Sequence, residues 1–339
     1  ALGASAYSVA VFHLMTHAFF KALLFLAAGS VIMGMHHNQD IRWMGGLRKY
    51  MPITWITSLL GTLALIGTPL FAGFYSKDSI IEAVHFSNLP AAGWAYFAVL
   101  AGVFVTSFYS FRLYFLVFHG PERYDQNPDA HHGHDDHHHD DHGHDQKPHE
   151  SPWVVTVPLL LLAVPSVVIG FMTIEPMLVG EFFADSVFVN NELHPAMETF
   201  REEFHGALSM ALHGLTTLPF YLALAGAVSA WYMYLINPAV PAALAKALRP
   251  LVVVLENKYY LDWFNENVLA RAVRGMGVGL WKGGDQGVIE SGVVNASWKL
   301  VGLVSGVVRR AQTGYLYHYA LMMIVGILLF MTYFVWLAK

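Results

Sequence analysis

The sequence predicts an all-α polytopic membrane protein with six transmembrane helices, one of them broken, and a long amphipathic helix on the membrane surface. Of the 339 residues, 55% are hydrophobic and only 13% are charged, which is about half the charged fraction of a typical soluble domain. The apolar residues also form long runs, and residues 153–174 and 215–236 contain no charged side chain. Runs of roughly 18 or more apolar residues are long enough to cross a bilayer as a helix.

Six segments are predicted to span the membrane, and the basic residues between them predict their orientation. The spans are expected at residues 6–35, 52–86, 93–118, 152–173, 213–236 and 318–337. If they alternate in direction, the connections rich in Lys and Arg lie on one side, and the other side is mainly acidic. Because cytoplasmic connections carry the excess of Lys and Arg, we assign the basic side to the cytoplasm. The chain begins at Ala1, and we expect it to be the downstream part of a longer protein.

The sequence also excludes several classes of site. It contains no cysteine, which excludes disulfides, thiolate zinc sites and cysteine-ligated iron–sulfur clusters. Neither a GxGxxG motif after a strand nor a P-loop is present, so nothing indicates a bound nucleotide. The net charge of −5 gives no sign of nucleic-acid binding.

Three ionisable residues share one face of the first segment. His13, His17 and Lys21 are spaced four residues apart, which advances about 40° per step on a helix and places them in one stripe. Ionisable groups inside hydrocarbon normally face a wet or polar protein interior. Since His titrates near neutral pH, the stripe is a candidate proton relay. The alternative is hydrogen bonding between helices with one lysine extended to the membrane surface.

The second segment carries the signs of a broken helix next to two more ionisable residues. Gly67, Pro69 and Gly73 disrupt an apolar run and are followed by Lys77 and Asp78. Discontinuous transmembrane helices occur where they line a cavity, and transporters use them to build ion sites. We therefore add Lys77 and Asp78 to the candidate relay, although adjacent residues point about 100° apart on a regular helix. An interfacial Lys–Asp pair at the end of a helix is the alternative.

Two further features lie outside the predicted spans. Residues 131–149 read HHGHDDHHHDDHGHDQKPH, which is expected to be a solvated loop; metal capture is the alternative, because imidazoles and carboxylates suit Zn or Ni. Residues 250–315 are too long and too charged to span. Apolar residues recur along this stretch at the period of an amphipathic helix. We expect this helix to lie on the membrane surface. Six glycines between residues 275 and 287 are expected to interrupt or bend it.

Several motifs resemble a known family of membrane subunits. HLMTHAFFKALLFLAAGSVI, MGGLRKYMP and GTPLFAGFYSKDSII resemble the closing helices of the antiporter-like subunits of respiratory complex I, which are related to Mrp-type sodium/proton antiporters. ENKYYLDWFNENV, LWKGGDQGVIE and QTGYLYHYA resemble the NuoL-type class, the class with a long lateral helix. The resemblance covers nearly the whole chain outside the His/Asp loop and residues 175–212.

The resemblance implies an organisation and a set of site residues. Residues 1–118 correspond to the end of the second antiporter-like repeat, and 119–151 to a cytoplasmic loop. Residues 152–240 then hold two peripheral helices, 241–315 the lateral helix and 316–339 the final helix. Lys21 matches the family's central lysine, with His13 and His17 beside it, and Lys77 matches the lysine of its broken helix.

The resemblance also implies a function. It suggests a proton-translocating subunit of NADH:quinone oxidoreductase in the bacterial inner membrane, with NuoM-, NuoN-, NuoK- and NuoJ-like partners. FMN, iron–sulfur clusters and quinone are then expected in partner subunits and no cofactor in this chain. A cation/proton antiporter or membrane-bound hydrogenase subunit of the same family is the first alternative. A purely structural membrane anchor is the second, but an anchor has no use for a buried His/Lys stripe.

Overall fold

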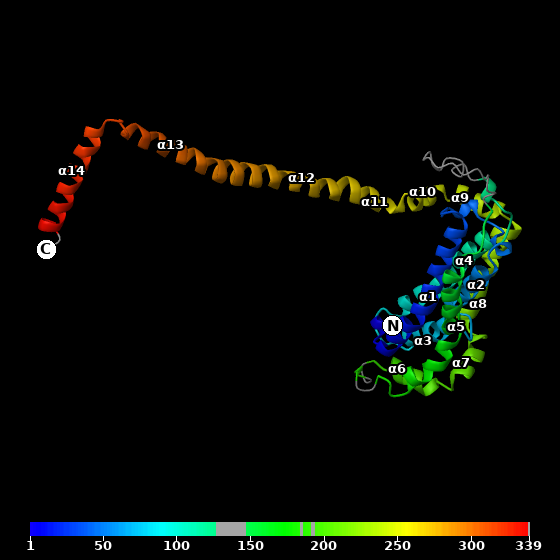
Figure 1. Cartoon of the computed structure of the whole chain (residues 1–339). Helices are drawn as coiled ribbons and strands as arrows, with labels where there is room; N and C mark the ends of the chain where they lie inside the picture. Colours follow the sequence, from blue (N-terminus) through cyan, green and yellow to red (C-terminus); the bar gives the residue numbers. More distant parts are fainter. Residues whose placement is uncertain (127–146, 184–185, 191–193, 338–339) are drawn as a thin grey trace. The chain divides into compact units, whose positions relative to one another are not determined.

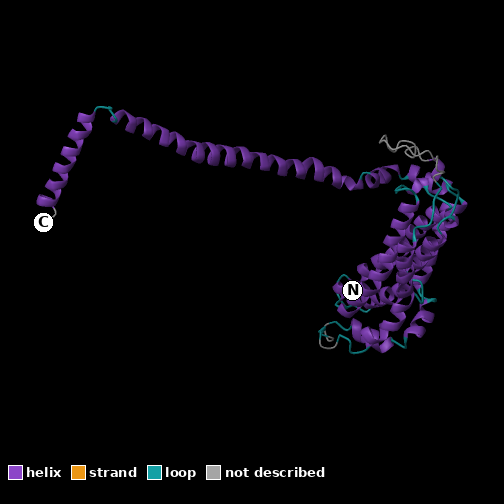
Figure 2. Cartoon of the chain, in the orientation of Figure 1, coloured by secondary structure: helices purple, strands orange, loops and turns teal. Residues whose placement is uncertain are grey.

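The computed structural model describes residues 1–126, 147–183, 186–190 and 194–337. The chain divides into two compact units, residues 1–247 and 248–339, and each is described by itself. Every regular element in the described residues is helical, and none of them is a strand (Figure 2). The predicted all-α polytopic fold class is therefore confirmed.

Unit 1 is a bundle of long helices closed by shorter ones. Its helices are α1 (Tyr7–Gly34), α2 (Pro52–Ile66), α3 (Ala72–His85), α4 (Ala92–Phe118), α5 (Trp153–Ile174), α6 (Ala196–Glu203), α7 (Ala207–Gly214), α8 (Leu218–Trp231) and α9 (Ala239–Ala247). Helix α1 packs against α2, α3 and α5, and α4 packs along α8 (Figure 1). One buried cluster, which includes Phe12, Tyr75 and Leu178, holds α1 and α3 to the turn that follows α5.

The break in the second predicted span lies where the sequence places it. Helix α2 ends at Ile66, and Gly67 follows with φ +79°, the left-handed conformation that glycine adopts without a steric penalty at the end of a helix. Helix α3 begins at Ala72. Gly73 lets it pass directly over the end of α2, because a Cβ at this position would clash with the carbonyl oxygen of Ala64.

The lengths and compositions of the helices identify the membrane spans. Six helices in the described residues are long and apolar enough to cross a membrane: Tyr7–Gly34, Ala92–Phe118, Trp153–Val179, Leu218–Ile236, Lys258–Ala311 and Leu316–Trp336. Five of them match predicted spans. The remaining prediction, the second span in chain order, corresponds to the broken pair α2–α3. Each of its halves is too short to be counted as a span alone. Helix Lys258–Ala311, with 54 residues, is far longer than the roughly 20 residues that a span needs.

The fifth predicted span is shorter than expected. The prediction began at residue 213, but His213 lies in the separate short helix α7, and α8 begins at Leu218. Thr216 and Thr217 donate their hydroxyl hydrogens to the carbonyl oxygens of His213 and Gly214. These bonds satisfy carbonyls at the end of α7.

The basic connections of unit 1 meet at one end of the bundle, as the sequence predicts. Lys49, after α1, donates to the Glu122 carboxylate, after α4, at 2.7 Å. The Glu150 carboxylate, just before α5, accepts from the Ile53 backbone N–H at 2.8 Å and from the Thr54 hydroxyl at 2.6 Å. It therefore caps the first turn of α2, where helix backbone N–H groups lack partners.

Unit 2 consists of α10 (Arg249–Glu256), α11 (Leu261–Phe264), α12 (Ala270–Leu280), α13 (Asn295–Ala311) and α14 (Leu316–Thr332). Lys258, Tyr259 and Tyr260 adopt left-handed φ values and interrupt the helix there. The expectation that the glycines interrupt it further on is wrong. The chain stays helical through all six and widens to a π-helix over Trp281–Val294. None of the described side chains of this unit is buried within it.

Candidate functional site

The predicted stripe forms on α1. His13, His17 and Lys21 are all partly buried, and the rings of His13 and His17 are 5.5 Å apart between centroids. The structure shows no hydrogen bond joining these three side chains in the part of the chain it describes. Proton transfer along the stripe would therefore need bridging water, which serves nearly as well as a direct bond.

A second helix reaches the stripe through a serine. Ser76, on α3, is completely buried, and its Oγ lies 2.9 Å from His13 Nδ1. The same Oγ accepts a hydrogen bond from the Thr16 hydroxyl at 2.8 Å. Because Ser76 directly precedes Lys77, this contact joins the histidine stripe to the residue beside the helix break.

Lys77 uses the break itself. Its ammonium group donates to the backbone carbonyl of Leu65, in the last turn of α2. Carbonyls at the end of a helix have no partner within that helix, and in a membrane they must be satisfied by other protein groups or by water. The break thus supplies a carbonyl acceptor to an amine deep in the bundle.

Asp78 lies beside Lys77 without pairing with it. The Asp78 side chain is only 7% exposed. Both residues line a cavity of about 20 Å³, together with Gly67, Phe74 and Phe220, which is room for about one water molecule. The structure records no ion pair between Asp78 and any residue it describes. The sequence argument that adjacent residues need not pair fits this geometry.

The charges of the candidate relay act on one another. Lys77 interacts electrostatically with Lys21, His13 and His17, and Lys21 interacts with His17. Like charges repel strongly where water is scarce. The protons on these groups are therefore coupled, and a proton gained by one group changes the affinity of the others.

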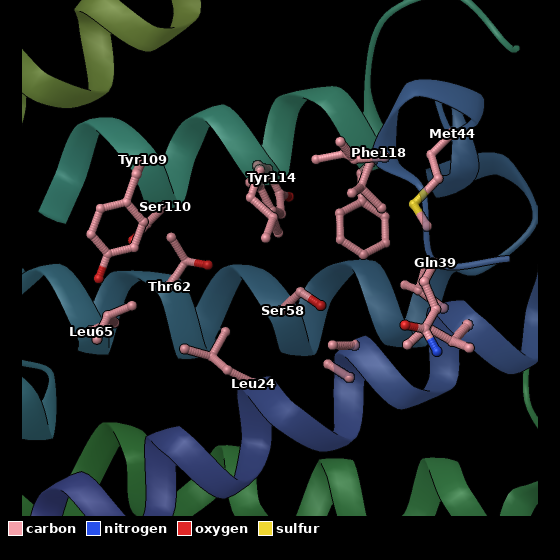
Figure 3. Close-up of a pocket in the computed structure, with 17 residues that line it drawn as sticks. Leu24, Gln39, Met44, Ser58, Thr62, Leu65, Tyr109, Ser110, Tyr114 and Phe118 are labelled. Carbon is pink, nitrogen blue, oxygen red and sulfur yellow. The ribbon is translucent and has the colours of Figure 1, made fainter. Parts of the chain in front are cut away.

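A separate cavity of about 250 Å³ lies between α1, α2 and α4. It runs from Gln39 and Met44, at the basic end, to Leu65 beside the break (Figure 3). Its walls are mostly apolar, with the hydroxyls of Ser58, Thr62 and Ser110 among them. None of the five candidate relay residues lines it.

Comparison with known proteins places this geometry in a family. The family model described as "NADH:quinone oxidoreductase/Mrp antiporter, TM" matches residues 1–108. The chain is 59% identical to NADH-quinone oxidoreductase subunit L of Neisseria meningitidis over 99% of its length and 50% of that relative. It is 35% identical to subunit L of Rhodobacter capsulatus, over 98% of the chain and 52% of that relative. It is 33% identical to NADH-ubiquinone oxidoreductase chain 5 of Marchantia polymorpha, over 98% of the chain and 47% of that relative.

The chain is similar to members of the NADH:quinone oxidoreductase/Mrp antiporter family. The predicted resemblance to its NuoL-type members is confirmed, and the chain is a multi-pass membrane protein. It spans about half the length of the curated relatives it matches. The part matched by the family model contains the whole stripe, the helix break, Lys77 and Asp78.

Sequence reasoning missed two residues that link α1 to α3, Thr16 and Ser76. Ser76 stands next to Lys77, and Thr16 lies within the stripe motif, but small hydroxyl residues are common in membrane helices and carry no distinctive spacing. Their role depends on contacts between residues 60 or more positions apart. The Arg112 guanidinium lies over the Tyr234 ring, 5.2 Å from the centroid, as a cation–π pair.

The structure offers no metal site among the residues it describes. No group of three or more His, Asp or Glu side chains there is arranged to hold an ion. Residues 131–146, most of the His/Asp loop, lie outside the described residues. The predicted solvated loop and its alternative, metal capture, are therefore not tested by the structure.

Proposed function

We propose that the chain forms part of a proton-translocating membrane subunit of NADH:quinone oxidoreductase. The observation that carries this proposal is the contact of His13 with Ser76, which joins a stripe of ionisable groups on α1 to Lys77 at the break of α2–α3. Three ionisable groups on one apolar helix are costly unless they face a hydrated interior. The helix break supplies the Leu65 carbonyl as an acceptor and a small cavity with room for about one water molecule.

The proposed path uses the chemistry of each group. Lys21, His17 and His13 accept and release protons in turn, with water between them. Imidazole suits this role because it gains and loses a proton near neutral pH. Ser76 orients His13 and directly precedes Lys77 on α3, from which the proton continues to Asp78. No group in this path changes its oxidation state, so electron transfer is assigned to other subunits.

The proposal extends to the assembly. We expect partners like NuoM, NuoN, NuoK and NuoJ, with FMN, iron–sulfur clusters and quinone bound in partner subunits and no cofactor in this chain. We place the complex in a bacterial inner membrane with the Lys49–Glu122 end of unit 1 in the cytoplasm. The long helix of unit 2 would lie along the membrane surface and clamp neighbouring subunits, since its apolar side chains are exposed.

The alternative within the family is a cation/proton antiporter or a membrane-bound hydrogenase subunit. The names of the relatives quoted above, all quinone oxidoreductase subunits or chains, favour the first proposal. Purification of the native complex in mild detergent, with mass spectrometry of its subunits, separates the two. Subunits that bind NADH and quinone support the proposal, whereas an assembly of small antiporter subunits alone would contradict it.

A further inference from the structure

A third cavity contains titratable groups that the proposed path does not use. It has a volume of about 330 Å³ and lies between α3, α6 and α7. Four titratable side chains line it: Glu82 on α3, Glu203 at the end of α6, His205 in the following turn and His213 on α7. This volume is ample for a cluster of water molecules. The lining comes entirely from described residues at the acidic end of unit 1.

This cavity and the small Lys77–Asp78 cavity share two helices as walls. Asp78 and Glu82 are four residues apart on α3, which places them on one face about 6 Å apart along the axis. On α7, His213 lines the large cavity and its neighbour Gly214 lines the small one. Asp78 interacts electrostatically with both His213 and Glu82, and Glu82 interacts with Glu203. The titratable groups therefore form a row from the helix break to the acidic end.

The row starts at a buried group that needs solvation. Asp78 is buried, with only 7% of its surface exposed. Neither its carboxylate nor that of Glu82 hydrogen-bonds to any residue within the described ranges. A carboxylate buried without partners is unfavourable, and ordered water is the usual solution. A hydrated row of this kind can conduct protons.

We propose that Glu82 and His213 pass protons from Asp78 into the cavity between α3, α6 and α7, which serves as the proton outlet; this rests on the proposed function. The Lys77 ammonium gives a proton to the Asp78 carboxylate, so that an N–H bond breaks as an O–H bond forms. The carboxylic acid passes the proton through water to the Glu82 carboxylate or the His213 imidazole. Water between Glu203 and His205 then receives it, and no electrons move.

Thiol labelling tests the outlet independently of pumping. Because residues 1–339 contain no cysteine, a single introduced thiol is the sole labelling site within this part of the subunit. In the assembled complex in sealed vesicles, a membrane-impermeant maleimide added on the acidic side should label Glu82→Cys and Ser209→Cys. It should not label Ser30→Cys, a buried position hydrogen-bonded to Thr54. Labelling of Ser209→Cys without Glu82→Cys would show that the cavity does not reach α3 and would overturn the proposal.

Pumping by variants tests the transfer step. The double variant Glu82→Gln/His213→Gln should slow proton release on the order of tenfold, at the low end of what positioned acid–base groups contribute. The control Glu202→Gln, on α6 but outside the cavity lining, should pump like wild type. If the double variant also pumps like wild type while Lys21→Met does not, the outlet is wrong and the relay stands. If the wild-type complex moves no protons, both proposals fail.

Discussion

His13 Nδ1 and Ser76 Oγ lie 2.9 Å apart although 63 residues separate them in the chain. This contact places the stripe of α1 against the helix that carries Lys77 and Asp78. It also settles how the two motifs of the sequence, which are far apart along the chain, meet in one region of the bundle.

Ser76→Ala is expected to slow proton pumping several-fold, because His13 and Thr16 both lose a hydrogen-bond partner. Loss of the buried hydroxyl should also destabilise the fold by roughly 1 kcal/mol. Ser79→Ala is the matched control, since Ser79 is equally buried on α3 but donates only to the Tyr75 carbonyl of its own helix. Proton uptake by proteoliposomes containing the assembled complex checks the difference, and equal rates for the two variants would remove Ser76 from the path.

Lys77→Ala is expected to slow pumping strongly, and Lys77→Arg to restore it only in part. Arginine can keep a bond to the Leu65 carbonyl but does not release its proton near neutral pH. Pumping rates of the two variants, normalised to the amount of assembled complex, test this order. Wild-type rates in Lys77→Ala would assign the lysine to a structural bond at the break.

The lateral helix is expected to hold neighbouring subunits through one apolar face. Val294, Trp298, Val301, Val304 and Val308 share this face, and all are exposed in the structure. Deleting residues 282–307 should release neighbouring membrane subunits while unit 1 still inserts. Val301→Asp should weaken co-purification, whereas Ala296→Asp, on the opposite face, should not. Full co-purification by the deletion variant would exclude the clamp.

The basic end of unit 1 should depend on pH through the Lys49–Glu122 pair. The hydrogen bond from Lys49 lowers the pKa of Glu122 below its ordinary value of 4.5, and the same bond raises the pKa of Lys49. The pair therefore stabilises this end at neutral pH. The contribution of Glu122 is lost as the pH falls below 4.5, and that of Lys49 is lost as the pH rises above 10.5.

Amide hydrogen exchange of residues 122–126, which include Glu122 but not His119, measures this pair. The ratio of exchange rates in Lys49→Met and wild type, taken at the same pH, cancels the intrinsic pH dependence of exchange. The ratio should exceed one at pH 7 and approach one at a pH well below 4.5. Arg48→Met is the control, because Arg48 contacts His119 and not Glu122. A ratio that is the same at both pH values would mean that the pair does not hold this end together.

The spans and the stripe could be predicted because they depend on local pattern. Run length and charge scarcity identify the membrane helices, and a spacing of four residues aligns His13, His17 and Lys21. Gly67, Pro69 and Gly73 likewise mark the break, since glycine and proline disrupt a helix whatever surrounds it.

The remaining features depend on distant contacts. Ser76 meets His13, and Glu150 caps α2 from 97 residues away; neither contact leaves a local signal. His213 gave no signal either, although Glu82 could have been noticed four residues after Asp78 on the same helical face. The glycines of residues 275–287 misled the prediction because each weakens a helix only by about 1 kcal/mol. The chain stays helical through all of them.

The central claim is that His13, His17 and Lys21 act as one proton path. Lys21→Met should lower the number of protons moved per NADH oxidised, while electron transfer to artificial acceptors continues, since no redox group is assigned to this chain. His17→Ala should have a milder effect, because water can fill the space that its ring leaves. The deciding measurement is the proton-to-NADH ratio of Lys21→Met in proteoliposomes with the fully assembled complex. A reduced ratio is the result this account predicts, and an unchanged ratio with normal assembly would contradict it.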